Sequence, residues 1–147
     1  MKDPVILLVE DNTSDEELTL RALTKSNIAN KVVVARDGSE ALDYLFARGN
    51  YADRDAREVP QVVLLDLNLP KLTGLEVLRA IRANDRTKLL PVVILTSSGE
   101  DKDLMGTYAS GANSYIVKPV DFTQFADSVR QLGIYWMLLN RPVPTID

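Results

Sequence analysis

The chain has no cysteine and no histidine. Without cysteine there can be no disulfide, no thiolate nucleophile and no zinc–thiolate site. Without histidine the chain lacks the commonest general base and metal ligand, any serine–histidine triad, and a phosphohistidine of its own. Its apolar runs are far shorter than the roughly 18 residues that a membrane span needs, and its first residues do not resemble a secretory leader. We therefore expect a cytoplasmic protein.

Clusters of basic residues are also missing, and the net charge is −4. This balance argues against a surface that binds the phosphate backbone of nucleic acid. The hydrophobic (46%) and charged (26%) fractions are typical of a globular protein. A chain of 147 residues fits one domain. We expect a single domain with a core over about residues 4–140 and a tail at 141–147.

Short apolar runs alternate with amphipathic segments along the chain. The pattern predicts strands at residues 5–9, 31–35, 61–67, 91–95 and 114–117, and helices at 12–25, 39–48, 74–83, 101–109 and 121 to about 140. Ser14 and Glu17 form a candidate capping box for the first helix. Residues 49–60 exceed the usual connection of about 2–6 residues, so they extend the preceding helix or form a functional loop. The alternation predicts an α/β fold with a parallel sheet and helices on both faces.

Polar residues follow four of the predicted strands. Asp66 ends the third strand, while the others end at Glu10-Asp11, Thr96 and Lys118. Ligands of parallel sheets bind at the carboxyl ends of the strands, so these side chains should converge. Neighbouring carboxylates repel each other unless a cation is present, and Mg²⁺ prefers oxygen ligands. Asp66 is therefore a candidate metal ligand, or a nucleophile that forms an aspartyl phosphate with support from Lys118 and Thr96.

Each of these residues also has a purely structural explanation. Adjacent acids before a helix favour its dipole, a strand-terminal threonine caps a helix, and a lysine is often solvated. Lys118-Pro119 is a candidate cis peptide that would aim the lysine inward. Tyr115 should pack half-buried against the last helix.

Taken together, these residues resemble the receiver domain of two-component response regulators. The resemblance rests on Glu10-Asp11, Asp66 within the run 64–70, Gly74, Thr96-Ser97-Ser98 and the run from Tyr115 to Pro119. It implies a flavodoxin-like three-layer sandwich around a doubly wound five-stranded parallel sheet in the order 2-1-3-4-5. It also implies a phosphoacceptor signalling protein, rather than an enzyme, that assists its own phosphorylation and dephosphorylation.

The resemblance assigns a role to each site residue. It makes Asp66 the phosphoacceptor, Glu10, Asp11, Asp66 and the Asn68 main-chain carbonyl the Mg²⁺ ligands, Thr96 and Lys118 the phosphoryl contacts, and Tyr115 the switch aromatic. Glu10 stands where many receivers have aspartate, a departure that the metal site should tolerate.

Further segments are similar to single-domain regulators partnered with phytochrome-type histidine kinases. They are 96–98, 111–115, 118–122 and 132–136. This similarity implies a phosphohistidine on a sensor kinase, or a small-molecule phosphodonor, as the source of the phosphoryl group. It also implies a downstream protein partner, and we expect no attached output domain.

The last predicted helix carries an apolar stripe of Phe122, Phe125, Val129 and Leu132, which Trp136 and Leu139 continue. Beyond Gly133 the helix is apolar nearly all round, and exposed apolar clusters mark partner surfaces. We therefore expect a homodimer through this helix and its neighbours, promoted by phosphorylation. The alternative is that the tail 141–144 folds back over it.

Three other functions share parts of this pattern. A haloacid-type phosphatase needs a second acid two residues after its nucleophile, where this chain has Asn68. A flavodoxin-like binder of FMN is disfavoured by the acidic first loop at 10–13. A degenerate receiver that acts only as a docking module would not need the acid, threonine and lysine set.

Overall fold

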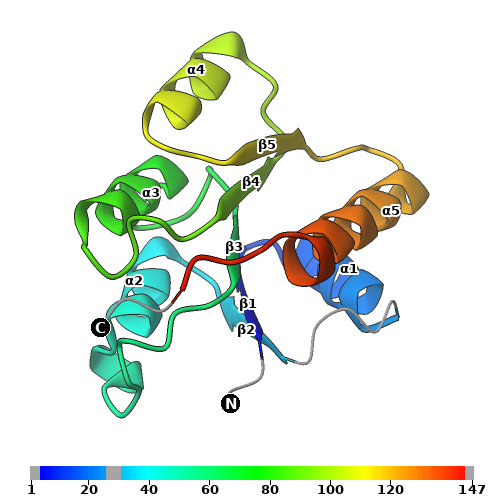
Figure 1. Cartoon of the computed structure of the whole chain (residues 1–147). Coiled ribbons are helices and arrows are strands. Elements are labelled where there is room, and N and C mark those ends of the chain that lie inside the picture. Colours follow the sequence, from blue (N-terminus) through cyan, green and yellow to red (C-terminus); the bar gives the residue numbers. More distant parts are fainter. Residues whose placement is uncertain (1–3, 26–30, 145–147) are drawn as a thin grey trace.

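The computed structural model describes residues 4–25 and 31–144, which alternate between strands and helices (Figure 1). The strands are β1 (Val5–Val9), β2 (Lys31–Ala35), β3 (Val62–Leu65), β4 (Val92–Thr96) and β5 (Ser114–Val117). The α-helices are α1 (Thr13–Lys25), α2 (Gly38–Phe46), α3 (Gly74–Ala83), α4 (Asp101–Ala109) and α5 (Phe122–Gly133). A 3₁₀ turn (Gly49–Tyr51) follows α2, and a π-helix (Ile134–Leu139) continues α5.

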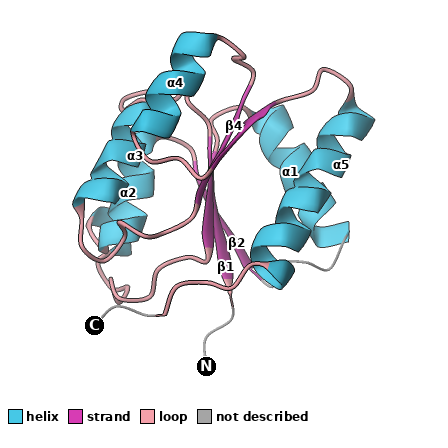
Figure 2. Cartoon of the chain, turned by 45° about the horizontal axis from the view of Figure 1, so that its top comes forward, coloured by secondary structure: helices cyan, strands magenta, loops and turns pink. Residues whose placement is uncertain are grey.

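The five strands form one parallel sheet in the order β2-β1-β3-β4-β5, which confirms the predicted fold class. Helices α2, α3 and α4 cover one face, and α1 and α5 cover the other (Figure 2). Alternate residues of each strand serve the two cores: Leu7 and Leu65 pack toward α2 and α3, while Leu8 and Leu64 pack toward α1 and α5. The central strands are thus buried on both faces, which explains their unbroken apolar sequences.

Helix α1 begins one residue later than predicted and with a different cap. The Asn12 side-chain oxygen accepts a hydrogen bond from the Asp15 backbone N–H at 3.0 Å, and the Asn12 carbonyl accepts from Glu16. Ser14 therefore lies inside the first turn, so the proposed capping box with Glu17 is wrong. A capping box does occur at α3, where Thr73 and Glu76 bond reciprocally.

Residues 49–60 fold against α2 instead of extending it. The helix ends at Phe46 because Ala47 adopts a left-handed conformation with φ of 55°. The Arg54 guanidinium lies 3.8 Å from the centre of the Tyr44 ring and donates to the carbonyls of Tyr44 and Glu58. The Tyr51 hydroxyl donates to Glu40 at 3.2 Å. Side chains of the segment thus hold it in one arrangement on the protein.

The last helix is not a uniform α-helix. Phe125 and Val129 are buried as predicted, but Phe122 is 71% exposed and Leu139 is 66% exposed, and Met137 is buried instead. Phe122 is the first residue of α5, whereas Leu139 and Met137 belong to the π-helix, whose i→i+5 turns take the residues after Gly133 out of the 3.6-residue period. The Gln61 side-chain amide donates to the carbonyls of Trp136 (3.0 Å) and Met137 (3.3 Å).

Within residues 4–25 and 31–144, none of the helices is both long and apolar enough to cross a membrane.

Gly74 has no room for a side chain, because an added Cβ would lie 2.2 Å from the Asp66 carbonyl oxygen and 2.6 Å from the Leu67 Cα. We predict that Gly74→Ala lowers the free energy of unfolding by about 3 kcal/mol, since backbone atoms must move. Urea unfolding measures this change. Gly106→Ala in α4 is the matched control: it meets nothing within 4 Å, and it should stabilise the protein by about 0.5–1 kcal/mol. Equal effects of the two substitutions would contradict the prediction.

Candidate functional site

The sheet brings the polar strand ends together at one edge. Val9 pairs with Leu65, which places Glu10 beside Asp66. The Glu10 backbone N–H donates to the Ala35 carbonyl, and that of Asp66 donates to the Val9 carbonyl, so the chain keeps its strand geometry up to both acids. Glu10 and Asp66 are both buried.

Lys118 reaches the same acids from the end of β5. Its side chain is only 8% exposed, and its Nζ lies 2.6 Å from Glu10 Oε1, 2.8 Å from Asp15 Oδ2 and 3.2 Å from Asp66 Oδ2. No cis peptide bond occurs in residues 4–25 and 31–144, so the lysine points inward with a trans bond to Pro119. The ammonium therefore joins three acids that would otherwise repel each other.

The environment changes the proton affinity of this cluster. Burial raises the pKa of Glu10 to about 7, although the Lys118 ammonium opposes the change. For Lys118, burial alone would lower the pKa, but hydrogen bonds to Asp15 and Glu10 and the charge of Asp66 outweigh it and raise the pKa. The lysine thus stays charged, and a further cation in the crevice would favour ionised Glu10.

The acids also fit a divalent metal ion. Glu10, Asp11 and Asp66 each offer an oxygen, and these three atoms lie within 4.8 Å of one another. Asp11 is exposed, so the group is open to solvent on one side. Hard carboxylate oxygens are the donors that Mg²⁺ and Mn²⁺ prefer. The exposed Asn68 lies next to this group, and its backbone N–H donates to Asp66 Oδ1 at 3.2 Å.

Thr96 and Tyr115 stand on the two strands beyond the acids and are linked through Ser98. Thr96 is fully buried at the end of β4, and its hydroxyl oxygen accepts a long hydrogen bond (3.4 Å) from the Ser98 backbone N–H. The Tyr115 hydroxyl donates to the Ser98 carbonyl at 2.8 Å. The Tyr115 ring is half-buried and lies on the α4 side of the sheet, 6.4 Å from the Tyr108 ring, rather than against the last helix.

Sequence reasoning missed Asp15. An acid in the first turn of a helix is ordinarily explained by the helix dipole. Its direction toward Lys118 depends on how α1 packs on the sheet and on how far the Lys118 side chain reaches from the end of β5, which no local pattern indicates.

Comparison with known proteins identifies this arrangement. The family model for the response regulator receiver domain matches residues 6–130. The chain belongs to the response regulator receiver family. This membership disfavours the flavodoxin and haloacid phosphatase alternatives.

Two curated relatives cover most of this receiver. It is 40% identical over 141 residues to the probable methanogenesis regulatory protein FilR2 of Methanothrix harundinacea, covering 95% of this chain and 88% of that protein. It is 36% identical over 133 residues to response regulator Rcp1 of Synechocystis, covering 90% of this chain and 88% of Rcp1.

Solved structures of response regulators are also similar to this chain. The bacteriophytochrome response regulator AtBRR is 53% identical with a TM-score of 0.75, over 96% of this chain and 100% of AtBRR. Phosphorylated RcpA, a cyanobacterial phytochrome response regulator, is 36% identical with a TM-score of 0.90, over 97% and 100%. The Mn²⁺-bound form of Rcp1 is 34% identical with a TM-score of 0.89, over 96% and 99%. This receiver thus resembles regulators linked to phytochromes.

Removing the lysine should destabilise the metal-free protein. We predict that Lys118→Met lowers the free energy of unfolding by about 3 kcal/mol, because buried carboxylates lose their counter-charge. Added Mg²⁺ should restore part of the loss. Urea unfolding with and without Mg²⁺ measures both effects. Lys88→Met is the control: its pair with Asp85 is exposed (51% and 93%), so a change of less than about 0.5 kcal/mol is expected. Unchanged stability of Lys118→Met would contradict the role of the ammonium.

Proposed function

We propose that this receiver accepts a phosphoryl group on Asp66 in a Mg²⁺-dependent reaction. One observation carries the proposal: the buried Asp66 carboxylate has an ammonium group 3.2 Å from one oxygen and belongs to a group of three acids suited to a metal ion. A nucleophilic carboxylate, a cation for the phosphoryl oxygens and a metal site are the parts that phosphoryl transfer needs.

The chain has no histidine, so the phosphoryl group comes from another molecule. We take the donor to be a phosphohistidine on a sensor kinase. One Asp66 oxygen attacks phosphorus, the phosphorus–nitrogen bond breaks, and its electron pair stays on the imidazole, which takes up a proton. Lys118 offers its charge to the phosphoryl oxygens. Glu10, Asp11, Asp66 and the Asn68 carbonyl would hold Mg²⁺, which would neutralise phosphoryl charge.

Thr96 and Tyr115 then respond to the phosphorylation of Asp66. We assign the Thr96 hydroxyl to a phosphoryl oxygen, which requires the start of the β4–α4 loop to move. The Tyr115 hydroxyl is bonded to Ser98 in that loop, so the ring would follow the movement.

The partner we propose is a phytochrome-type histidine kinase. The support is similarity to RcpA and AtBRR, whose descriptions name a phytochrome and a bacteriophytochrome.

Phosphorylation is tested directly with acetyl phosphate and Mg²⁺. We expect intact-protein mass spectrometry to show one added phosphoryl group, which Asp66→Asn abolishes and removal of Mg²⁺ prevents. Asp127→Asn, a change of an exposed acid on α5, is the matched control and should label like the unaltered protein. A chain that takes up no phosphoryl group would instead be a degenerate receiver used for docking.

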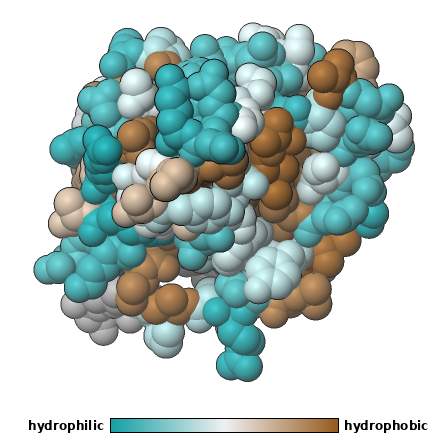
Figure 3. Space-filling model, turned by 90° about the horizontal axis from the view of Figure 1, so that it is seen from above, coloured by the Kyte–Doolittle hydropathy of each residue, from teal (hydrophilic) through white to brown (hydrophobic). Residues whose placement is uncertain are grey.

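We propose that the last helix transmits the signal by binding a partner. Leu138 is 65% and Leu139 is 66% exposed, so the tail 141–144 does not cover them. The alternative, in which the tail folds back over the end of the helix, is therefore wrong for these two residues. Hydrophobic patches also lie among polar residues on the face seen in Figure 3. We propose that the exposed leucines form part of a homodimer interface.

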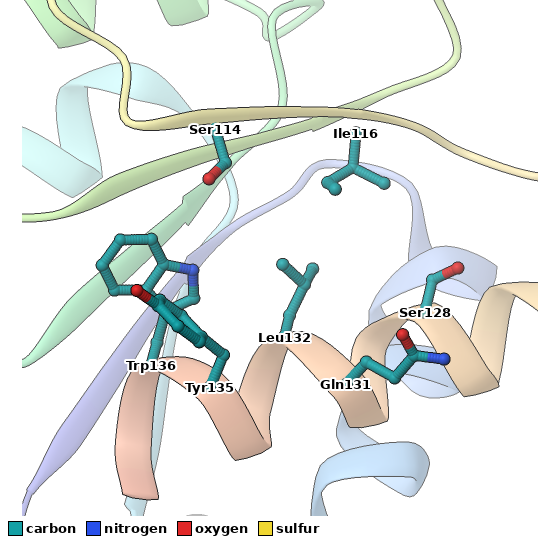
Figure 4. A pocket seen from close by; sticks show the side chains of 7 residues that line it. All are labelled: Ser114, Ile116, Ser128, Gln131, Leu132, Tyr135 and Trp136. Atoms are coloured by element: carbon teal, nitrogen blue, oxygen red, sulfur yellow. The ribbon is translucent and has the colours of Figure 1, made fainter. Parts of the chain in front are cut away.

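A hollow lies between the last helix and β5. Its volume is about 280 Å³. Figure 4 shows Ser114 and Ile116 of β5 facing Leu132 and Trp136 across it. Side chains of a second copy could enter it and bury apolar surface.

Sedimentation velocity with and without beryllofluoride tests the dimer. We predict that the phosphoryl mimic promotes a dimer, and that Leu138→Glu weakens it at least roughly tenfold by placing a charge in the interface. Leu89→Glu, at a leucine that is 53% exposed between α3 and β4, is the control and should dimerise normally. A protein that stays monomeric under both conditions would rule out this interface.

A further inference from the structure

The Lys118 ammonium contacts carboxylates from three different elements. Glu10 follows β1, Asp15 belongs to α1 and Asp66 follows β3. Their oxygens lie 2.6, 2.8 and 3.2 Å from Nζ. An ammonium group has three N–H donors and no acceptor. Each donor therefore has one carboxylate.

The three carboxylates have different fates if Asp66 is the phosphoacceptor. Glu10 and Asp66 belong to the group that can hold a metal ion, whereas Asp15 does not. A bound metal ion would engage the Glu10 carboxylate, and phosphorylation would make one Asp66 oxygen part of an acyl phosphate, which is a mixed anhydride. Only Asp15 keeps the same charge and the same neighbour throughout the reaction.

Asp15 is also held firmly. Its backbone N–H donates to the Asn12 side chain at 3.0 Å, and its carbonyl accepts from the hydroxyl of the fully buried Thr19 at 2.7 Å. Its side chain is 26% exposed, at the rim of the crevice. The backbone that carries this carboxylate is thus fixed at the start of α1.

The neighbouring acids of α1 show that this contact is more than a favourable interaction with the helix dipole. Glu16 pairs with Arg36 at 3.1 Å on the surface, and Glu17 is exposed. All three acids lie near the start of the helix, yet Asp15 is the one that the structure directs at Lys118.

We propose that Asp15 is a positioning residue for Lys118. Its carboxylate holds one N–H of the ammonium in place. A second N–H can then exchange its hydrogen bond to the Asp66 carboxylate for one to a phosphoryl oxygen with little movement of the lysine side chain. A group already oriented for the transition state lowers the barrier. This inference rests on the proposed phosphorylation of Asp66.

The kinetic test compares Asp15→Asn with Glu17→Gln, a control that removes the same charge from the same helix without touching Lys118. Phosphorylation by acetyl phosphate is followed over a range of donor concentrations at saturating Mg²⁺. We expect Asp15→Asn to lower the maximal rate roughly tenfold, the loss of one charge-assisted hydrogen bond. The half-saturating donor concentration, and the Mg²⁺ affinity from calorimetry, should change less than about twofold because Asp15 is not a metal ligand.

A second variant separates positioning from general damage. Asp15→Glu keeps the carboxylate and should recover most of the rate, whereas Asp15→Asn should not. Any of three results would overturn the inference: an unchanged or faster rate in Asp15→Asn, an equal loss in Glu17→Gln, or no recovery in Asp15→Glu.

A measurement without phosphorylation separates this inference from the proposed function. In proton–nitrogen NMR spectra of the metal-free protein, the Lys118 ammonium protons should exchange slowly with water, and Asp15→Asn should speed exchange at least about fivefold. Equal exchange in the two proteins contradicts the contact itself. A chain that shows this effect but takes up no phosphoryl group from acetyl phosphate contradicts the proposed function instead.

Discussion

The site depends on one cation held between three acids. Glu10 and Asp66 lie side by side because β1 and β3 are paired in register, and burial makes their charges costly. The Lys118 ammonium offsets that cost by contacting both acids together with Asp15. It thereby ties the end of β5 to the ends of β1 and β3 and to the start of α1. Any metal ion or phosphoryl group that enters must redistribute these contacts, and this makes the cluster sensitive to both.

The topology of the sheet explains why the acids meet where they do. The chain places β2 on one side of β1 and β3 on the other, so the crossovers diverge at the carboxyl ends of β1 and β3. Apolar residues fill both faces of these strands, and their polar residues are confined to the ends. Gly74 allows α3 to begin against the backbone of Asp66, which closes one wall of the crevice without a side chain in the way.

Local patterns predicted the five strands, their parallel arrangement and the meeting of Glu10, Asp66 and Lys118, because each depends on burial period or on the rule for strand ends. The order of the strands was predicted only from the resemblance to the receiver family. Local patterns could not predict the features that depend on packing between distant segments. The contact of Asp15 depends on how α1 packs on the sheet and on the reach of the Lys118 side chain from the end of β5. The π-helix depends in part on Gln61, which satisfies two of its carbonyls from the other end of β3. The fold of residues 49–60 depends on Arg54 reaching back to Tyr44.

Strand β5 connects the site to the surface proposed for partners. Its residues alternate in direction: Tyr115 packs on the α4 side and bonds to Ser98, while Ser114 and Ile116 face the last helix. Lys118 follows directly after the strand, and its backbone N–H bonds to the Thr96 carbonyl. A four-residue strand with partners on both faces cannot shift at its end without disturbing both. A change in the contacts of Lys118 would therefore alter the packing of Tyr115 on one face and the packing beside Trp136 on the other.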